Sequence, residues 1–196
     1  MRTAHCLKRL KPLMKKPFFS SKEAKAVGVH PSAIAYFIKS GRVKRIARGL
    51  YQSSEYANAS SFRWEDLIEA VYTVKDGVIC LTSALAIYDL TEEIPRQHWI
   101  AIPHSTSTKK AQDYKIIRFR NPLLGKTSIN LEGAKVPIYD RERTIIDAFR
   151  FLSIETAIKA LKFALKGKKQ IDLNKLQDYA QKLHIDIKPY LMSITV

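Results

Sequence analysis

The chain has 196 residues, of which 34 are Lys or Arg and 18 are Asp or Glu, so its formal net charge is +16 at pH 7. This length suits one large domain or two small ones, and the charge favours a polyanionic partner such as nucleic acid. Residues 1–60 hold 13 Lys and Arg against Glu23 and Glu55, a net +11, whereas residues 61–196 hold 21 against 16, a net +5. The N-terminal part is therefore the stronger candidate for nucleic-acid binding.

Several other classes of protein have little support. The N-terminus is basic but carries no apolar segment of the kind found in signal peptides. The longest apolar stretch, Val78 to Leu90, is interrupted by polar residues and is too short for a membrane span. Cys6 and Cys80 lie far apart, and the five histidines show no metal-ligand spacing. We expect a protein of the reducing cytoplasm with no membrane contact, no metal and no cofactor.

The first residues predict a supporting helix. Residues 2–16 are basic and carry one apolar stripe, formed by Leu7, Leu10, Leu13 and Met14. Pro12 lies inside this segment and argues against an unbroken helix. We expect the segment either to pack on the elements that follow or to extend as an arm along the phosphate backbone of DNA.

The segment that follows has the signals of a helix-turn-helix. Ser20 or Ser21 can cap a first helix, and Ser20 with Glu23 has the spacing of a capping box. Gly28 suits the positive φ with which a chain leaves a helix, and Pro31 suits the first turn of a second helix. The pattern predicts two short helices joined by a tight turn.

The second of these helices has two different faces. Its inner face has apolar residues at i, i+3, i+4 spacing, namely Ile34, Phe37 and Ile38. We expect them to pack against Phe19, Ala24 and Val27. The outer face carries small or polar residues, namely Ser32, Ala33, Tyr36 and Lys39. Side chains of this kind allow a helix to enter the major groove and approach the base edges.

A cationic hairpin is predicted after the second helix. Residues 42–46 alternate cationic and apolar side chains, and residues 50–52 can return antiparallel to them across a turn at residues 47–49. Its cations, Arg42, Lys44, Arg45 and Arg48, are placed to meet phosphates, which position a protein on DNA without reading its sequence. Residues 1–60 therefore predict a winged helix-turn-helix domain that binds duplex DNA. The alternative is a solvated amphipathic hairpin beside an ordinary helical hairpin.

A polar stretch without periodicity, residues 53–61, predicts a linker, and we place the domain boundary after residue 60. Residues 61–196 open with two helices. The first runs from Trp64 to Val74, with Leu67, Ile68, Val71 and Tyr72 buried. The second runs from Ser83 to Leu90, with Thr82 as its cap.

Four segments rich in β-branched and aromatic residues follow: His98–Ile102, Tyr114–Phe119, Ser128–Leu131 and Lys135–Tyr139. Pro103, Pro122 and Pro137 are expected to restrict these strands to short or edge positions. Three helices then close the chain, capped by Asp140, by Ser153 and by Asp172 or Asn174, with Leu173 among the residues that face inward in the last. Residues 61–196 thus predict an α+β domain with a small, mostly antiparallel sheet and C-terminal helices.

An enzyme is the weaker alternative. Asp140, Glu142 and Lys135 have the residue types of a metal-dependent nuclease. Acids are common at a helix start, however, because they cap free amides and complement the helix dipole, and no third carboxylate is placed to complete a metal site. Ser83 lacks the G-x-S-x-G surroundings of a hydrolase nucleophile. We expect no catalytic residues.

Five segments together resemble the AbiEi family of antitoxins, the DNA-binding members of type IV toxin–antitoxin pairs. They are S-K-E-A-K-A-V-G-V at Ser21 to Val29, G-R-V-K-R-I-A-R-G-L-Y at Gly41 to Tyr51, L-T-S-A-L-A-I-Y at Leu81 to Tyr88, W-I-A-I-P at Trp99 to Pro103 and D-R-E-R-T-I-I-D-A at Asp140 to Ala148. Many winged helices share the hairpin pattern, whereas the ordered succession of all five is more specific. The basic leader before Phe18 departs from the family pattern.

The resemblance implies a winged helix before an α+β antitoxin domain, repression of the protein's own operon through its promoter, and neutralisation of a toxin of nucleotidyltransferase fold with or without a stable complex. The promoter-binding role then falls on the outer face of the second helix and on the hairpin cations named above. Arg141 and Arg143 are candidates for the antitoxin role, and salt bridges or a solvated first turn are the other interpretation. A plain transcription factor whose C-terminal domain binds an effector or a protein remains the alternative function.

Overall fold

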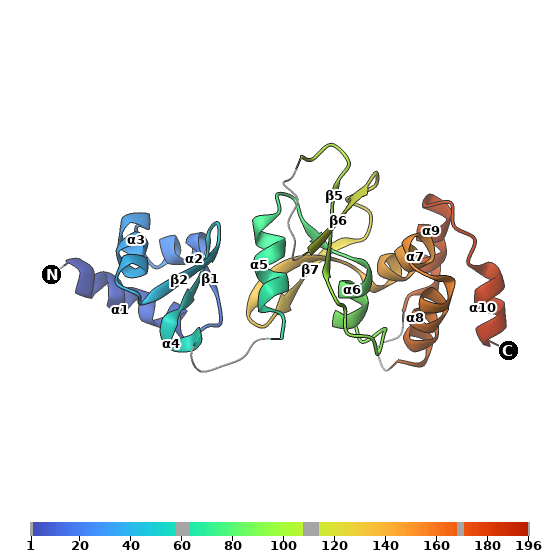
Figure 1. Ribbon diagram of the computed structural model, residues 1–196, viewed down its shortest axis with the longest axis horizontal. Helices are drawn as coiled ribbons and strands as arrows, with labels where there is room; N and C mark the ends of the chain where they lie inside the picture. Colours follow the sequence, from blue (N-terminus) through green and yellow to red (C-terminus); the bar gives the residue numbers. More distant parts are fainter. Residues whose placement is uncertain (1, 58–62, 108–113, 168–170, 196) are drawn as a thin grey trace. The chain divides into compact units, whose positions relative to one another are not determined.

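The computed structural model describes residues 2–57, 63–107, 114–167 and 171–195. Contacts within the chain divide it into two compact units, residues 1–74 with 130–136 and residues 75–129 with 137–196. Figure 1 shows both units with most of their helices and strands labelled. The boundary predicted after residue 60 falls within residues 58–62, which lie outside the described residues.

The first unit contains five helices and three strands among its described residues, apart from the strand ends at residues 130–136. In chain order they are α1 (Arg2–Met14), β1 (Phe19–Ser20), α2 (Ser21–Ala26), α3 (Pro31–Lys39), β2 (Val43–Ala47), β3 (Leu50–Ser53), α4 (Ser54–Ala57) and α5 (Glu65–Thr73). The start of the predicted linker is regular structure, because it is occupied by the end of β3 and by α4. The structure also groups α5 with the N-terminal elements.

Helix α2 begins and ends where the sequence predicts. Ser20 Oγ accepts a hydrogen bond from the Glu23 N–H at 3.2 Å, and Glu23 Oε2 accepts one from the Ser20 N–H at 2.8 Å, so the capping box is complete. Gly28 has a φ of +75°, which residues with a side chain rarely adopt. Pro31 then opens α3, with His30 as its N-cap.

A hydrophobic core joins α1 to the two helices of the motif. Helix α1 continues through Pro12, and Leu10 and Leu13 on either side of that proline are buried against α2 and α3. The basic N-terminal segment therefore packs on the motif, which was the first of its two expected placements. The buried members of this core are Leu10, Leu13, Phe19, Ala24, Val29, Ile34, Phe37 and Val43.

The three strands of this unit form an antiparallel sheet of order β1-β3-β2. Phe19 of β1 and Arg45 of β2 both lie opposite Tyr51 of the central strand. Ala47 belongs to β2, so the turn of the hairpin is shorter than predicted and consists of Arg48 and Gly49. The β2–β3 hairpin is thus extended by β1, and β1 leads directly into α2.

Most of a five-stranded sheet of order β6-β5-β4-β8-β7 lies in the second unit. Its strands are β4 (Val78–Ile79), β5 (His98–Pro103), β6 (Tyr114–Phe119), β7 (Lys126–Leu131) and β8 (Ala134–Tyr139). The α+β class and the C-terminal helices are confirmed. The larger sheet is more mixed than expected, because β4 pairs antiparallel with β5 while β5 with β6 and β4 with β8 are parallel pairs.

Pro137 was expected to restrict its strand to a short or edge position, but it lies in β8, an internal strand of six residues. The reason is the length of the neighbouring strand. β4 has two residues and is in register with β8 only at Ile138, so there is little of a hydrogen-bond ladder for the proline to interrupt.

Helices α6 (Leu81–Ile87), α7 (Arg141–Phe151), α8 (Ile154–Lys166), α9 (Leu173–Lys182) and α10 (Lys188–Thr195) complete the second unit. Asp140, Ser153 and Asp172 cap α7, α8 and α9 with side-chain hydrogen bonds. Thr82 does not cap α6, because that helix begins one residue before it. Leu173 was expected inside but is 45% exposed, because it is the first residue of α9 and lies next to its exposed cap. No helix of the described residues is long and apolar enough to span a bilayer.

The Ser20 cap gives the first stability prediction. Ser20→Ala removes the acceptor for the Glu23 N–H, and we expect it to lower the free energy of unfolding by about 1 kcal/mol. Ser153→Ala, which removes the cap of α8 in the second unit, is the matched control. Urea denaturation of both variants, with DNA binding measured beside it, will show whether only the Ser20 change weakens the motif. An unchanged midpoint for Ser20→Ala would mean that the capping box does not stabilise the first unit.

Candidate nucleic-acid interface

Helix α3 presents one apolar face to the core and one polar face to solvent. Ile34 and Phe37 are buried, and Ile38 is half-buried against the same core. Ser32, Tyr36 and Lys39 are exposed, as the sequence predicts, and the Tyr36 side chain is 52% exposed. The outer face is therefore accessible to a large partner along the whole helix.

Of the four residues predicted on the outer face of α3, Ala33 does not lie there. It is half-buried and packs against the core of the first unit. Ala35 is exposed in its place. The signal was present in the sequence, because residues 32, 35, 36 and 39 have the i, i+3, i+4, i+7 spacing of a single helical face. We call Ser32, Ala35, Tyr36 and Lys39 the α3 face.

The N-terminus of α3 is fixed by its own side chains. The Ser32 N–H donates to His30 Nδ1 at 3.4 Å, and Ser32 Oγ lies 2.9 Å from the same nitrogen. A backbone N–H can only donate, so Nδ1 is the acceptor in this contact and caps the N-terminus of α3. His30 was not among the DNA-binding residues predicted from the sequence. It lies next to the α3 face because it is the N-cap of α3.

All four predicted hairpin cations are exposed: Arg42, Lys44, Arg45 and Arg48. Lys44 and Arg45 are neighbours, and in a regular strand they would point to opposite faces. Both residues pair in regular register, Lys44 with Gln52 and Arg45 with Tyr51, because the register shift of this hairpin comes only between Arg45 and Ala47. The hairpin therefore carries exposed cations on both of its faces.

These cations differ in how far they are already paired. Lys44 Nζ lies 4.0 Å from Glu65 Oε1, and Arg45 Nε donates to the Ala47 carbonyl at 3.4 Å. Among the described residues, neither Arg42 nor Arg48 has a carboxylate within ion-pair distance. Arg42 and Arg48 are therefore available to a phosphate without breaking an ion pair in the described part of the chain, whereas Lys44 would give up only a weak exposed pair.

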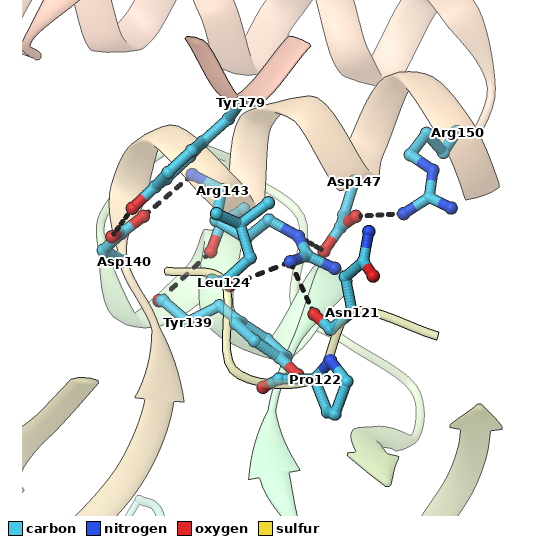
Figure 2. Close-up of polar contacts among 10 residues, drawn as sticks. Asn121, Pro122, Leu124, Tyr139, Asp140, Arg143, Asp147, Arg150 and Tyr179 are labelled. Atoms are coloured by element: carbon cyan, nitrogen blue, oxygen red, sulfur yellow. Dashed lines mark hydrogen bonds and ion pairs between the residues drawn. The ribbon is translucent and has the colours of Figure 1, made fainter. Parts of the chain in front are cut away.

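The second unit uses its arginines differently, as the Arg143 network in Figure 2 shows. Arg143 has no exposed surface; its Nε donates to Asp147 Oδ2 at 2.8 Å, and its Nη1 donates to the carbonyls of Asn121 at 3.0 Å and Leu124 at 2.8 Å. Arg150 Nη1 donates to the other Asp147 oxygen at 3.0 Å. Burial raises the pKa of Asp147, while the two arginines act to lower it.

The Arg143 network holds the loop before β7 against α7. Gly125 in this loop has a φ of +70°, and a Cβ there would lie 2.6 Å from Arg143 Cβ, so the close approach requires glycine. The guanidinium also lies 4.8 Å from the centre of the Tyr139 ring, a cation–π distance. Arg143 is thus a structural residue, in agreement with the salt-bridge interpretation that the sequence left open beside the antitoxin role.

Arg141 is also engaged within the second unit. Its Nη2 donates to the Tyr88 carbonyl at 3.3 Å, and its guanidinium lies 5.4 Å from the centre of the Tyr88 ring. The residue is half-exposed. Its packing against α6 favours the structural interpretation over a free surface charge.

Asp140 and Glu142, the acidic pair considered for a nuclease, form ion pairs and hydrogen bonds within the second unit. Lys175 Nζ lies 3.0 Å from Asp140 Oδ2 and 3.2 Å from Glu142 Oε2. Tyr179 donates to Asp140 Oδ2 at 3.1 Å (Figure 2), and Glu142 Oε1 accepts from the Asp172 N–H at 3.1 Å. Although partial burial lowers it, the pKa of Lys175 is raised by these carboxylates. The pair joins α9 to α7, and no group of three or more described His, Cys, Asp or Glu side chains is placed to hold a metal ion.

Residues 13–54 match the family model described as a transcriptional regulator, AbiEi antitoxin. The match begins at the end of α1 and includes α2, α3 and the β2–β3 hairpin, and it confirms the resemblance over this segment. The family is one of regulators and antitoxins, not of enzymes. No curated protein matches the chain.

The contrast between the two arginines on Asp147 gives a stability prediction. Arg143→Met leaves two carbonyls and a buried carboxylate without their main donor, and we expect a loss of about 3–5 kcal/mol in the free energy of unfolding. Arg150→Gln, at a side chain that is 26% exposed, removes only the second partner and should cost about 1 kcal/mol or less. Urea denaturation followed by circular dichroism measures both. Equal, small losses would show that the network is not a structural centre.

Proposed function

We propose that this protein is a promoter-binding repressor and antitoxin of a type IV pair. In this proposal residues of the first unit form a winged helix-turn-helix that binds duplex DNA upstream of the protein's own operon. The second unit counteracts a toxin of nucleotidyltransferase fold, and the protein acts in the cytoplasm. The family match over residues 13–54 supports the regulator and antitoxin class.

One observation carries the DNA-binding part of the proposal: the α3 face is exposed and is followed in the chain by a hairpin with four exposed cations. Ser32 and Ala35 are small, so they allow the backbone of α3 to approach base edges in the major groove. Tyr36 and Lys39 are long enough to reach those edges. The hairpin cations then meet phosphates, which set affinity and register.

The antitoxin part of the proposal rests on the family match, since the structure engages both candidate residues, Arg141 and Arg143, within the second unit. Arg143 is enclosed and Arg141 packs on Tyr88, so neither is the main contact to a partner in this proposal. Antitoxicity is assigned to the second unit because the DNA-binding surface accounts for the first. The toxin is opposed either by contact with this unit or through the toxin's target.

Duplex binding tests the division of roles between α3 and the hairpin. Wild-type protein is expected to shift its own upstream duplex at physiological salt and not a scrambled duplex. Tyr36→Ala and Lys39→Ala should reduce the preference for the correct duplex by about 1–3 kcal/mol wherever the side chain contacts a base, whereas Arg48→Ala should weaken both duplexes alike and lower the salt slope by about one. Equal binding of the two duplexes by wild-type protein would overturn the proposal.

Cell protection tests the separation of the two activities. We expect the combined variant Tyr36→Ala, Lys39→Ala and Arg48→Ala to lose promoter binding yet to protect cells from the toxin expressed from an unrelated promoter. All three side chains are exposed and lie in the first unit, so the second unit should be unaffected. Growth of toxin-expressing cells, at matched antitoxin levels, is the measurement. Loss of protection would favour a plain transcription factor that acts only through DNA.

A further inference from the structure

Helix α1 and the turn that follows it present a second set of exposed cations in the first unit, separate from those of the hairpin: Lys8, Arg9 and Lys11 in the helix and Lys15 just after it. Lys16, the next cation, is paired with Glu23 at 2.9 Å. Among the described residues, the other four lie outside ion-pair distance of any carboxylate. Cations that are exposed and unneutralised are available to a polyanion, so the question is which of them lies beside the predicted DNA-binding helices.

Arg9 is the member of this set that reaches the helix-turn-helix itself. Its Nη1 lies 2.6 Å from the position that a Cβ on Gly28 would occupy. Gly28 is in the turn that leads to His30 and Pro31, the first residues of α3. The guanidinium thus lies beside the N-terminal end of α3, and a side chain larger than hydrogen at position 28 would displace it.

The hairpin cations begin at the other end of the same helix. Lys39 ends α3, and Arg42 follows it by three residues. The nine residues of α3 rise about 1.5 Å each, so its ends are about 13 Å apart. This is close to the width of the DNA major groove, about 12 Å, whose edges are lined by the phosphates of opposite strands.

We propose that Arg9 is a phosphate contact at one edge of the major groove, and that Arg9 and the hairpin cations hold the two strands on either side of α3. This inference rests on the DNA-binding function proposed above and extends the interface to α1. It assigns a role to the basic leader before Phe18, for which the family pattern provides none.

The chain offers a matched control for Arg9. Lys11 is exposed on the same helix and has the same charge. Two residues along an α-helix is about 200°, so Arg9 and Lys11 lie on opposite sides of the buried Leu10. Only Arg9 is therefore on the side of the α2–α3 turn.

The test uses the full-length protein with its own upstream duplex and a scrambled duplex, in fluorescence anisotropy from 50 to 200 mM salt. Arg9→Gln is expected to weaken binding of both duplexes about fivefold near 150 mM salt, and to reduce the slope of log K against log salt by about 0.9, the value for one phosphate contact. Lys11→Gln is expected to bind as wild-type protein does. Circular dichroism verifies that both exposed substitutions leave the fold intact.

Phosphate ethylation interference locates the contact. Wild-type protein should be blocked by ethylation at both edges of the groove, Arg9→Gln should lose sensitivity at one edge, and Arg48→Gln at the other. Equal losses for Arg9→Gln and Lys11→Gln, no loss for Arg9→Gln, or the same edge affected by both arginines would overturn the inference while leaving the proposed function intact. Failure of wild-type protein to distinguish the two duplexes would instead reject the proposed function.

Discussion

The direction change at Gly28 is the constraint on which the arrangement of the first unit depends. Its φ of +75°, which residues with a side chain rarely adopt, ends α2 and starts the turn into α3. With α2 closed by its capping box and α3 opened by Pro31, the apolar residues of both helices meet in one core with α1. Because the apolar side chains of α3 pack into this core, its polar side chains face solvent.

Charge has opposite roles in the two units. In the first, the hairpin cations are solvated and largely unpaired, so they can exchange counterions for phosphates at little cost. In the second, Arg143 is enclosed by a carboxylate, two carbonyls and aromatic rings, where removing a partner is far more costly than on the surface. Arginine is thus exposed to solvent in the hairpin of the first unit and enclosed as part of the fold in the second.

The sequence was most informative where local chemistry decides the structure. The capping box, the turn glycine, Pro31 and the caps of the last helices all lie where their residue types predict, because each acts within a few residues. Ala33 was placed on the wrong face because its burial depends on the core beneath α3, although the spacing of Ala35 indicated the right face. The sequence left Arg143 open between an antitoxin role and a salt bridge because two of its partners, Asn121 and Leu124, lie about twenty residues away in sequence. The mixed sheet depends on pairing between distant strands, which residue patterns do not reveal.

Site-specific photocrosslinking tests the central claim most directly, because it reports which surface touches DNA. A benzoylphenylalanine introduced in place of Tyr36 should crosslink to the upstream duplex and be competed by unlabelled duplex of the same sequence. The same probe in place of Phe163, an exposed residue of α8 in the second unit, should give no crosslink. A crosslink from position 163 with none from position 36 would contradict the account, since the DNA would then be bound by the other unit.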